Sequence, residues 1–262
     1  MPKLTKENKF IDVSDYGRFI ATFCANILKN TPTTPVQVTL VFGVCGLLAV
    51  YCILTHYYLM AGILLILKSI IDAIDGELSR LKKTPTYTGR YLDSIFDIIL
   101  NFMFLLAICR ISTSSIWLTL LAFVCVQLQG TLYNYYYVIL RNRSQGSDTT
   151  SQIFETKIPK ALPGETQKTV NILFSIYRML YGVYDKTIYL LDQNAHKMQT
   201  FPNWFMTLVS FYGLGFQLMI IAVMLAFNWV DYVIHFFIFY SIFIFILVGI
   251  RKTILAPKML MA

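Results

Sequence analysis

Apolar residues fall in long continuous blocks along the chain, separated by short polar segments. Six of these blocks are long enough to cross the hydrocarbon core of a bilayer as α-helices, which requires about 20 residues each. They cover residues 36–56, 57–80, 91–113, 115–139, 204–228 and 231–250. The pattern predicts an all-α polytopic membrane protein with six transmembrane helices.

A shorter amphipathic segment precedes the first block. From Val13, apolar residues recur every three or four positions at Tyr16, Ile20, Phe23 and Ile27, which gives a helix one apolar face. Basic residues flank this segment, so we expect a helix that lies in the cytoplasmic membrane interface.

A second amphipathic segment lies between the fourth and fifth blocks. Its apolar positions follow a seven-residue rhythm through Val170, Leu173, Tyr177, Leu180, Tyr184, Ile188 and Leu191. The rhythm predicts a helix of about six turns. Three roles remain open for it: lying on the membrane, covering a functional site, or pairing with another subunit in a homodimer.

Lysine and arginine residues orient the predicted bundle. They gather in the N-terminal arm, after the second span, between the fourth and fifth spans, and after the sixth. The turns after the first and fifth spans contain none, and the turn after the third contains only Arg110. By the positive-inside rule, both termini of this integral membrane protein are expected in the cytoplasm.

These features divide the chain into four parts. They are an N-terminal arm with the interfacial helix (1–34), spans one to four (35–140), a cytoplasmic insertion with the second amphipathic helix (141–203), and the last two spans with a cytoplasmic tail (204–262).

Composition agrees with a membrane location. The chain is 56% hydrophobic and only 14% charged, and its mean hydropathy is +0.60. The net charge of +8 therefore indicates a basic cytoplasmic surface facing anionic membrane lipids, and not a nucleic-acid partner. The five cysteines lie in or beside apolar segments without a CxxC pair, which is typical of small buried side chains.

Acidic residues occur where the apolar pattern makes them most costly. Asp72 and Asp75 lie near the end of the second span, and Asp93 and Asp97 lie at the start of the third. Helical spacing puts each pair on one face, and an antiparallel hairpin would bring all four carboxylates together near the cytoplasmic surface. Lys68, one turn before Asp72, would neutralise part of this charge.

Four close carboxylates must be protonated or hold cations. Two divalent cations would balance them, and hard oxygen ligands favour Mg²⁺, Mn²⁺ or Ca²⁺. Paired metal ions suit displacement at phosphorus. Two other interpretations are helix caps, which explain one aspartate better than four, and a cation or proton transporter, since intramembrane acids also mark ion pathways.

The spacing of these residues identifies a family resemblance. The sequence reads Asp72-x2-Asp75-Gly76-x2-Ser79-Arg80-x8-Gly89-x3-Asp93-x3-Asp97. It resembles D-x2-D-G-x2-A-R-x8-G-x3-D-x3-D, the signature of the CDP-alcohol phosphotransferases (CDP-alcohol phosphatidyltransferases), with serine in place of the alanine. "TPTTPVQVTL" resembles the family's Pro-Asn-x-x-Thr segment, although Val36 replaces the asparagine; Thr39 is retained.

The resemblance implies transfer of a substituted phosphate from a CDP-linked donor to an alcohol, with release of CMP. It implies two Mg²⁺ ions, for which Mn²⁺ can substitute, bound by Asp72, Asp75, Asp93 and Asp97, with Asp97 also acting as the general base. The positions that match the family's nucleotide site are Asp72, Gly76, Ser79, Arg80, Gly89 and Thr39. The active site is then expected near the cytoplasmic face.

The substrates are less well determined by the sequence. "GRYLDSIFD" lacks the run characteristic of choline and ethanolamine phosphotransferases, so we expect CDP-diacylglycerol as the donor and a small polar alcohol as the acceptor, in phospholipid biosynthesis. Transfer from CDP-choline or CDP-ethanolamine to diacylglycerol is the alternative. Candidate acceptor-binding residues are Gln127, Asn134, Arg141 and Arg251, which could instead serve as helix contacts or interfacial anchors.

Overall fold

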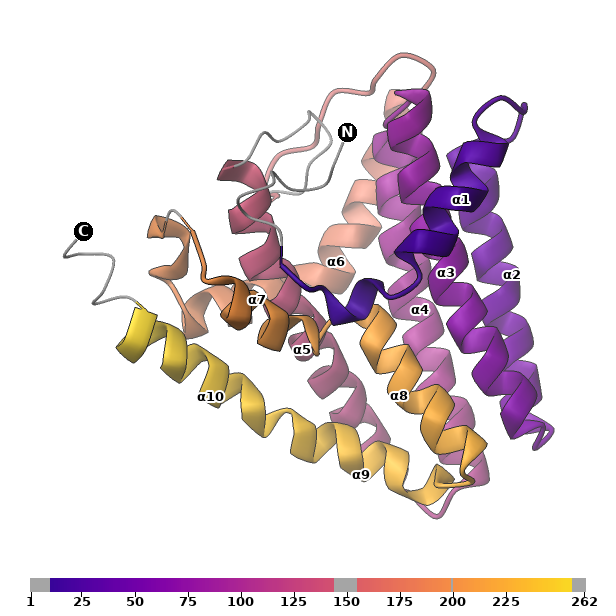
Figure 1. The fold of residues 1–262 in the computed structure, drawn as a ribbon, viewed down its shortest axis with the longest axis vertical. Coiled ribbons are helices and arrows are strands. Elements are labelled where there is room, and N and C mark those ends of the chain that lie inside the picture. The colour runs from indigo at the N-terminus through magenta and orange to yellow at the C-terminus, as the bar shows by residue number, and fades with distance from the viewer. Residues whose placement is uncertain (1–9, 144–154, 199, 256–262) are drawn as a thin grey trace.

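The computed structural model describes residues 10–143, 155–198 and 200–255, and every regular element in these ranges is helical. The α-helices are α1 (Arg18–Leu28), α2 (Pro35–Leu54), α3 (Tyr58–Lys82), α4 (Tyr87–Ile111), α5 (Ile116–Arg143), α6 (Gln167–Leu191), α7 (Asn203–Ser210), α8 (Leu214–Ala226), α9 (Val230–Tyr240) and α10 (Ile242–Ile250) (Figure 1). Short helical turns occur at Val13–Asp15, Ala195–Lys197 and Arg251–Leu255. The all-α fold is confirmed.

Local sequence signals explain where the first helices of the bundle begin. Thr34 and Gln37 form a reciprocal capping box at the start of α2, with backbone-to-side-chain distances of 3.3 and 2.9 Å, and Pro35 supplies a helical φ at the first position. At α4, the Thr86 hydroxyl accepts the N–H of Gly89 at 3.0 Å. This cap starts α4 at Tyr87, four residues before the apolar block that predicted it.

Membrane-crossing helices account for most of the predicted spans. In the described part of the chain, α2, α4, α5 and the continuous segment Val230–Leu255 are long and apolar enough to cross, and α7 with α8 forms a fifth, bent candidate. The predicted count of six is not confirmed. The helix at the second predicted span, α3, is long enough to cross but contains Lys68, Asp72 and Asp75. It packs against α1, α2 and α8.

The fifth predicted span, 204–228, is interrupted. Helices α7 and α8 meet at 46°, and the N-terminal segment crosses the bundle at this bend. A Cβ on Gly215 would lie 2.0 Å from the Ser14 carbonyl oxygen, and one on Gly213 would lie 2.3 Å from the Ser14 side chain. The glycines therefore admit a close backbone crossing that a straight helix with side chains would block.

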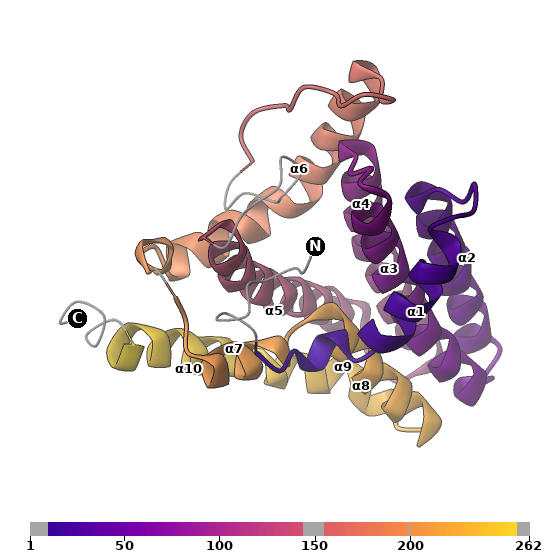
Figure 2. The ribbon, with the colours of Figure 1, turned by 45° about the horizontal axis from the view of Figure 1, so that its top comes forward.

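The two amphipathic segments are both helices. In α1, Ala21 and Ala25 are buried, whereas Phe19, Phe23 and Ile27 are exposed, so an apolar face points outward as expected of a helix that rests on lipid. Helix α6 packs against α4 and also against α5 (Figure 2). It thus covers two helices of its own chain, which include the helix that bears Asp93 and Asp97.

Candidate active site

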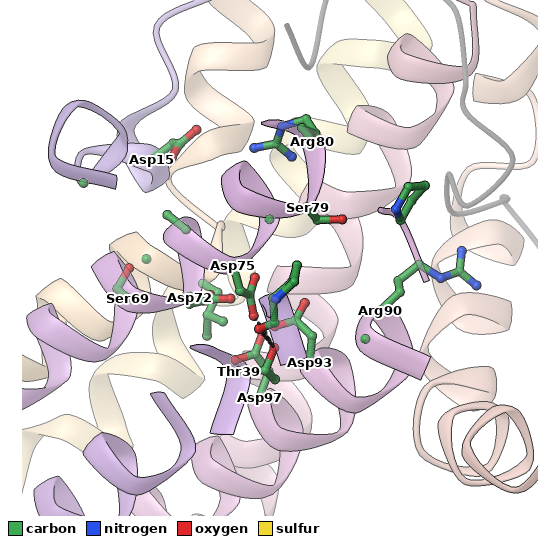
Figure 3. Close-up of a pocket in the computed structure, with 18 of the residues that line it drawn as sticks. Asp15, Thr39, Ser69, Asp72, Asp75, Ser79, Arg80, Arg90, Asp93 and Asp97 are labelled. Atoms are coloured by element: carbon green, nitrogen blue, oxygen red, sulfur yellow. Dashed lines mark hydrogen bonds between the residues drawn. The ribbon is translucent and has the colours of Figure 1, made fainter. Parts of the chain in front are cut away.

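A pocket of about 800 Å³ opens between α3, α4 and the N-terminal segment. Both acidic pairs predicted from the sequence face it: Asp72 and Asp75 from α3, and Asp93 and Asp97 from α4 (Figure 3). Helices α3 and α4 both pack against α2. Their acidic faces converge on the pocket, as the helical spacing predicted.

Three of the carboxylates form a compact group. Asp72, Asp75 and Asp93 each place one oxygen so that all three lie within 4.8 Å of one another. The Oδ1 atom of Asp93 is buried and has no hydrogen-bond partner in the described part of the chain. A buried carboxylate oxygen is rarely left unpaired. An all-oxygen group with one unpaired buried atom fits a divalent cation such as Mg²⁺ or Mn²⁺.

Thr39 fixes one of these ligands from a third helix. Its hydroxyl donates a hydrogen bond of 2.5 Å to Oδ2 of Asp75, and this contact is buried. Both residues are less than one tenth exposed. This hydrogen bond orients the carboxylate of Asp75, which is the usual role of a residue behind a metal ligand.

The fourth carboxylate has a different partner. Asp97 forms an ion pair with Lys68, whose ammonium also lies 3.8 Å from Asp72 and 4.5 Å from the centre of the Phe42 ring. Lys68 is only 1% exposed. The expectation that this lysine neutralises part of the acidic stripe is confirmed, and its main contact is with Asp97.

Basic residues also line the pocket. Arg80, Lys83, Arg90 and Arg141 all contribute to its wall. The guanidinium of Arg80 donates to Glu77 at 2.6 Å, and that of Arg90 donates to Glu155 at 2.5 Å. The pocket is therefore acidic at one part of its wall and basic at another, an arrangement suited to metal ions that meet a phosphorylated ligand.

The small motif residues leave room beside these charges. A Cβ added to Gly76 would meet only the Arg80 guanidinium, at 3.5 Å, whereas one on Gly89 would lie 2.8 Å from the capping hydroxyl of Thr86. Ser79 lines the pocket, and its hydroxyl lies 3.4 Å from the carbonyl of Thr84. Gly76 thus widens the pocket, and Gly89 protects the cap of α4.

The four candidate acceptor-binding residues fall in different places. Arg141 lines the pocket, and the other three are not among its lining residues. Gln127 is buried, whereas Asn134 is exposed. Arg251 is 2% exposed and forms an ion pair with Asp192, which also accepts a 2.7 Å hydrogen bond from Tyr136. This pair joins the end of the Val230–Leu255 segment to the residue after α6.

Several lining residues were not predicted from the sequence. Asp12, Ser14 and Asp15 come from the N-terminal segment, and Tyr133 comes from α5. The Tyr133 hydroxyl donates to Asp12 at 2.6 Å across 121 residues of sequence. No local sequence pattern predicts such a contact, because it depends on the N-terminal segment crossing the bend between α7 and α8.

Comparison with known proteins agrees with this site. A family model described as CDP-alcohol phosphatidyltransferase matches residues 32–242. The chain is 32% identical over 171 residues to a protein of Thermococcus kodakarensis named bifunctional IPC transferase and DIPP synthase. This match covers 64% of the chain but only 38% of the relative, so the chain spans well under half of that protein. The family model includes the motif from Asp72 to Asp97 and most of the helical bundle, and on this evidence the chain belongs to the CDP-alcohol phosphatidyltransferase family.

Proposed function

We propose that this protein is an integral membrane transferase that moves a substituted phosphate group from CDP-diacylglycerol to an alcohol, with release of CMP, in phospholipid biosynthesis. One observation carries the proposal. The three-carboxylate group of Asp72, Asp75 and Asp93, with its unpaired buried oxygen, faces a pocket that arginines also line. Family membership supports the reaction type.

The proposed roles follow the geometry. Divalent cations would be held by Asp72, Asp75 and Asp93. The full site would hold two cations, with Asp97 near the second cation. Bound Mg²⁺ or Mn²⁺ would supply charge stabilisation for the oxygens around the reacting phosphorus. Arg80 would contact the donor phosphates, and the open space at Gly76 and Ser79 would receive the cytidine.

Asp97 is proposed as the general base. It lines the same pocket as the metal-binding group, and its ion pair with Lys68 fixes one side of its carboxylate. A carboxylate can accept the proton of an attacking hydroxyl if it reaches the oxygen. Among the four acceptor-binding candidates, only Arg141 lines this pocket, so we propose that it anchors a polar group of the acceptor alcohol.

The pocket faces the cytoplasm in this proposal, where soluble CDP-linked compounds and CMP are handled. The apolar outer face of α1 would rest on the adjacent lipid. Transfer from CDP-choline or CDP-ethanolamine to diacylglycerol uses the same cluster, so the donor has to be determined directly.

The test is CMP release by the purified protein in detergent micelles. CDP-diacylglycerol is supplied with neutral, phosphorylated and amino alcohols in turn, and CDP-choline and CDP-ethanolamine are supplied with diacylglycerol. We expect CMP release with CDP-diacylglycerol and one alcohol class, its loss with EDTA, and its recovery with Mg²⁺ or Mn²⁺. Full turnover in metal-free buffer would contradict the metal roles. Absence of CMP release with every donor, alongside cation flux in proteoliposomes, would favour the transport alternative.

A further inference from the structure

Lys68 is a buried cation inside the candidate metal centre. It is 1% exposed, and its carboxylate neighbours are Asp97, with which it forms an ion pair, and Asp72, at 3.8 Å. Its ammonium also lies against the face of Phe42, at 4.5 Å from the ring centre. A lysine is almost never fully buried without such partners, and its placement at this centre calls for an explanation beyond packing.

Lys68 and a divalent cation would compete for one carboxylate. Asp72, Asp75 and Asp93 supply the compact group of three oxygens, which leaves Asp97 as the fourth aspartate of the two acidic pairs and the candidate ligand for a second cation. In the structure Asp97 is engaged by Lys68 instead. A fixed ammonium and a divalent ion on the same carboxylate repel one another strongly at short distance, even at an effective dielectric constant of about 20.

Formal charges indicate when a second cation becomes favourable. The four carboxylates on α3 and α4 that face the pocket, Asp72, Asp75, Asp93 and Asp97, carry four negative charges when ionised, and Lys68 offsets one of them. One divalent cation would leave the centre close to neutral, so a second would make it positive. A diphosphate-bearing ligand brings at least two further negative charges, and these would balance a second divalent cation.

We propose that Lys68 is a built-in counter-ion of Asp97 that takes the place of a second divalent cation until a diphosphate ligand arrives. The centre then binds one divalent ion alone and two in the presence of the ligand. The identity of the ligand as a CDP compound rests on the proposed function, whereas the one-ion state depends only on the residues around Lys68.

The experiment counts bound Mn²⁺ by electron paramagnetic resonance of the free ion, using purified protein in detergent with and without CDP. Wild-type protein is expected to bind one Mn²⁺ per chain alone and two with CDP. Lys68→Met removes the charge but keeps a long apolar stem, and should bind two without CDP, with second-site affinity raised at least about tenfold. Lys68→Arg retains the charge and should bind one without CDP, as the wild type does.

Each remaining outcome contradicts the proposal. If the wild-type protein binds two Mn²⁺ ions tightly without CDP, Lys68 does not take the place of the second cation. A Lys68→Met protein that folds and binds one ion without CDP would show that the lysine serves packing alone. If Lys68→Met does not fold, the test compares the number of Mn²⁺ ions bound by Lys68→Gln with the number bound by the wild-type protein. CMP release is measured separately, so loss of the transferase proposal would leave these ion counts interpretable.

Discussion

Thr39 shows how a single residue outside the acidic motif can control the metal centre. Its 2.5 Å hydrogen bond holds Asp75 from α2, and helix α2 packs against both α3 and α4. Replacing Thr39 by valine keeps the shape of the side chain but removes the donor. Loss of a partner behind a metal ligand typically lowers affinity or activity about 10- to 100-fold.

We therefore expect Thr39→Val to weaken Mn²⁺ binding about 10- to 100-fold without changing the fold. Thr39→Ser retains a hydroxyl in the same hydrogen-bond position and is the matched control. Calorimetric titration of Mn²⁺ into each protein makes the comparison. Equal affinities for the valine and serine variants would show that Asp75 does not need the hydrogen bond.

Asp97 and Asp75 should respond differently to the same substitution. Asp97→Asn removes the charge and the ability to take a proton, so we expect metal-dependent CDP binding to persist while turnover falls about 10²- to 10⁴-fold. Asp75→Asn removes a member of the three-carboxylate group and should weaken CDP binding and turnover together. Binding by calorimetry and rates of CMP release are compared for both variants. If Asp97→Asn abolishes CDP binding as fully as Asp75→Asn does, Asp97 is mainly a ligand and the base lies elsewhere.

The acidic site could be predicted because its members lie on two helices joined by a short loop. Positions three or four apart share a helix face whatever the rest of the fold does, so Asp72, Asp75, Asp93 and Asp97 could be brought together from spacing alone. The ion pair between Arg90 and Glu155 could not, because it spans 65 residues and depends on how the insertion packs. Long-range contacts of this kind leave no periodic signal.

At the level of elements, the insertion holds the first turn of α4. The carboxylate of Glu165 accepts the backbone N–H groups of Tyr87 at 3.2 Å and Thr88 at 2.6 Å. It thus satisfies donors that a helix start leaves without intrahelical partners. Burial by itself would raise the pKa of Glu165, but the hydrogen bonds from Thr88, Tyr87 and Leu162 outweigh it and lower this pKa.

A lowered pKa means that the ionised Glu165 stabilises the fold above its unfolded-state pKa, and that this contribution is lost as the pH falls through the folded-state value. We expect Glu165→Gln to lower the melting temperature at pH 7.5 and to lower it less near pH 4. Differential scanning fluorimetry in detergent makes the measurement. A melting-temperature difference that is the same at both pH values would contradict the assigned charge effect.

Asp185 on α6 should show the opposite sign. Burial, with a smaller contribution from nearby Glu155, raises the pKa of Asp185 to about 7. The folded state then binds a proton more tightly than the unfolded state, so stability falls as the pH rises from about 4 to about 7. Asp185→Asn is expected to raise the melting temperature at pH 8 more than at pH 5. A lower melting temperature for this variant at pH 8 would show that the ionised carboxylate is stabilising.

The fifth predicted span shows where an apolar pattern fails to give the shape of a helix. Residues 204–228 are apolar enough for one crossing, yet α7 and α8 meet at 46°. Ser14 lies at this bend, with its side chain beside Gly213 and its backbone carbonyl beside Gly215. Hydropathy reports the solvent around a segment but not the close approach of a distant one, so the bend could be located only from the structure.

For the whole molecule, the side on which each chain end lies depends on whether α3 crosses the membrane. The other helices supply four crossings, or five with the bent pair. Five crossings would place the two chain ends on opposite sides, and a sixth through α3 would place them on the same side. Helix α3 is 25 residues long, which at 1.5 Å per residue is enough to span. Asp72 and Asp75 face a pocket instead of lipid, and Lys68 is buried, which reduces the cost of placing these charges there.

Charge distribution favours the sixth crossing. The N-terminal arm carries Lys3, Lys6 and Lys9, and the other end carries Arg251, Lys252 and Lys258. We therefore expect fluorescent-protein fusions at both chain ends to be active in the cytoplasm, and alkaline phosphatase inserted after His56 or Ser114 to be active on the opposite side. The two insertions lie in the turns after α2 and α4, so they control for fusions that merely fail to fold. A cytoplasmic N-terminus with a C-terminus on the far side would mean an odd number of crossings. If the insertion after Ser114 is then inactive while that after His56 is active, α3, with Asp72 and Asp75, enters the membrane without traversing it, and the positive-inside assignment of the pocket is wrong.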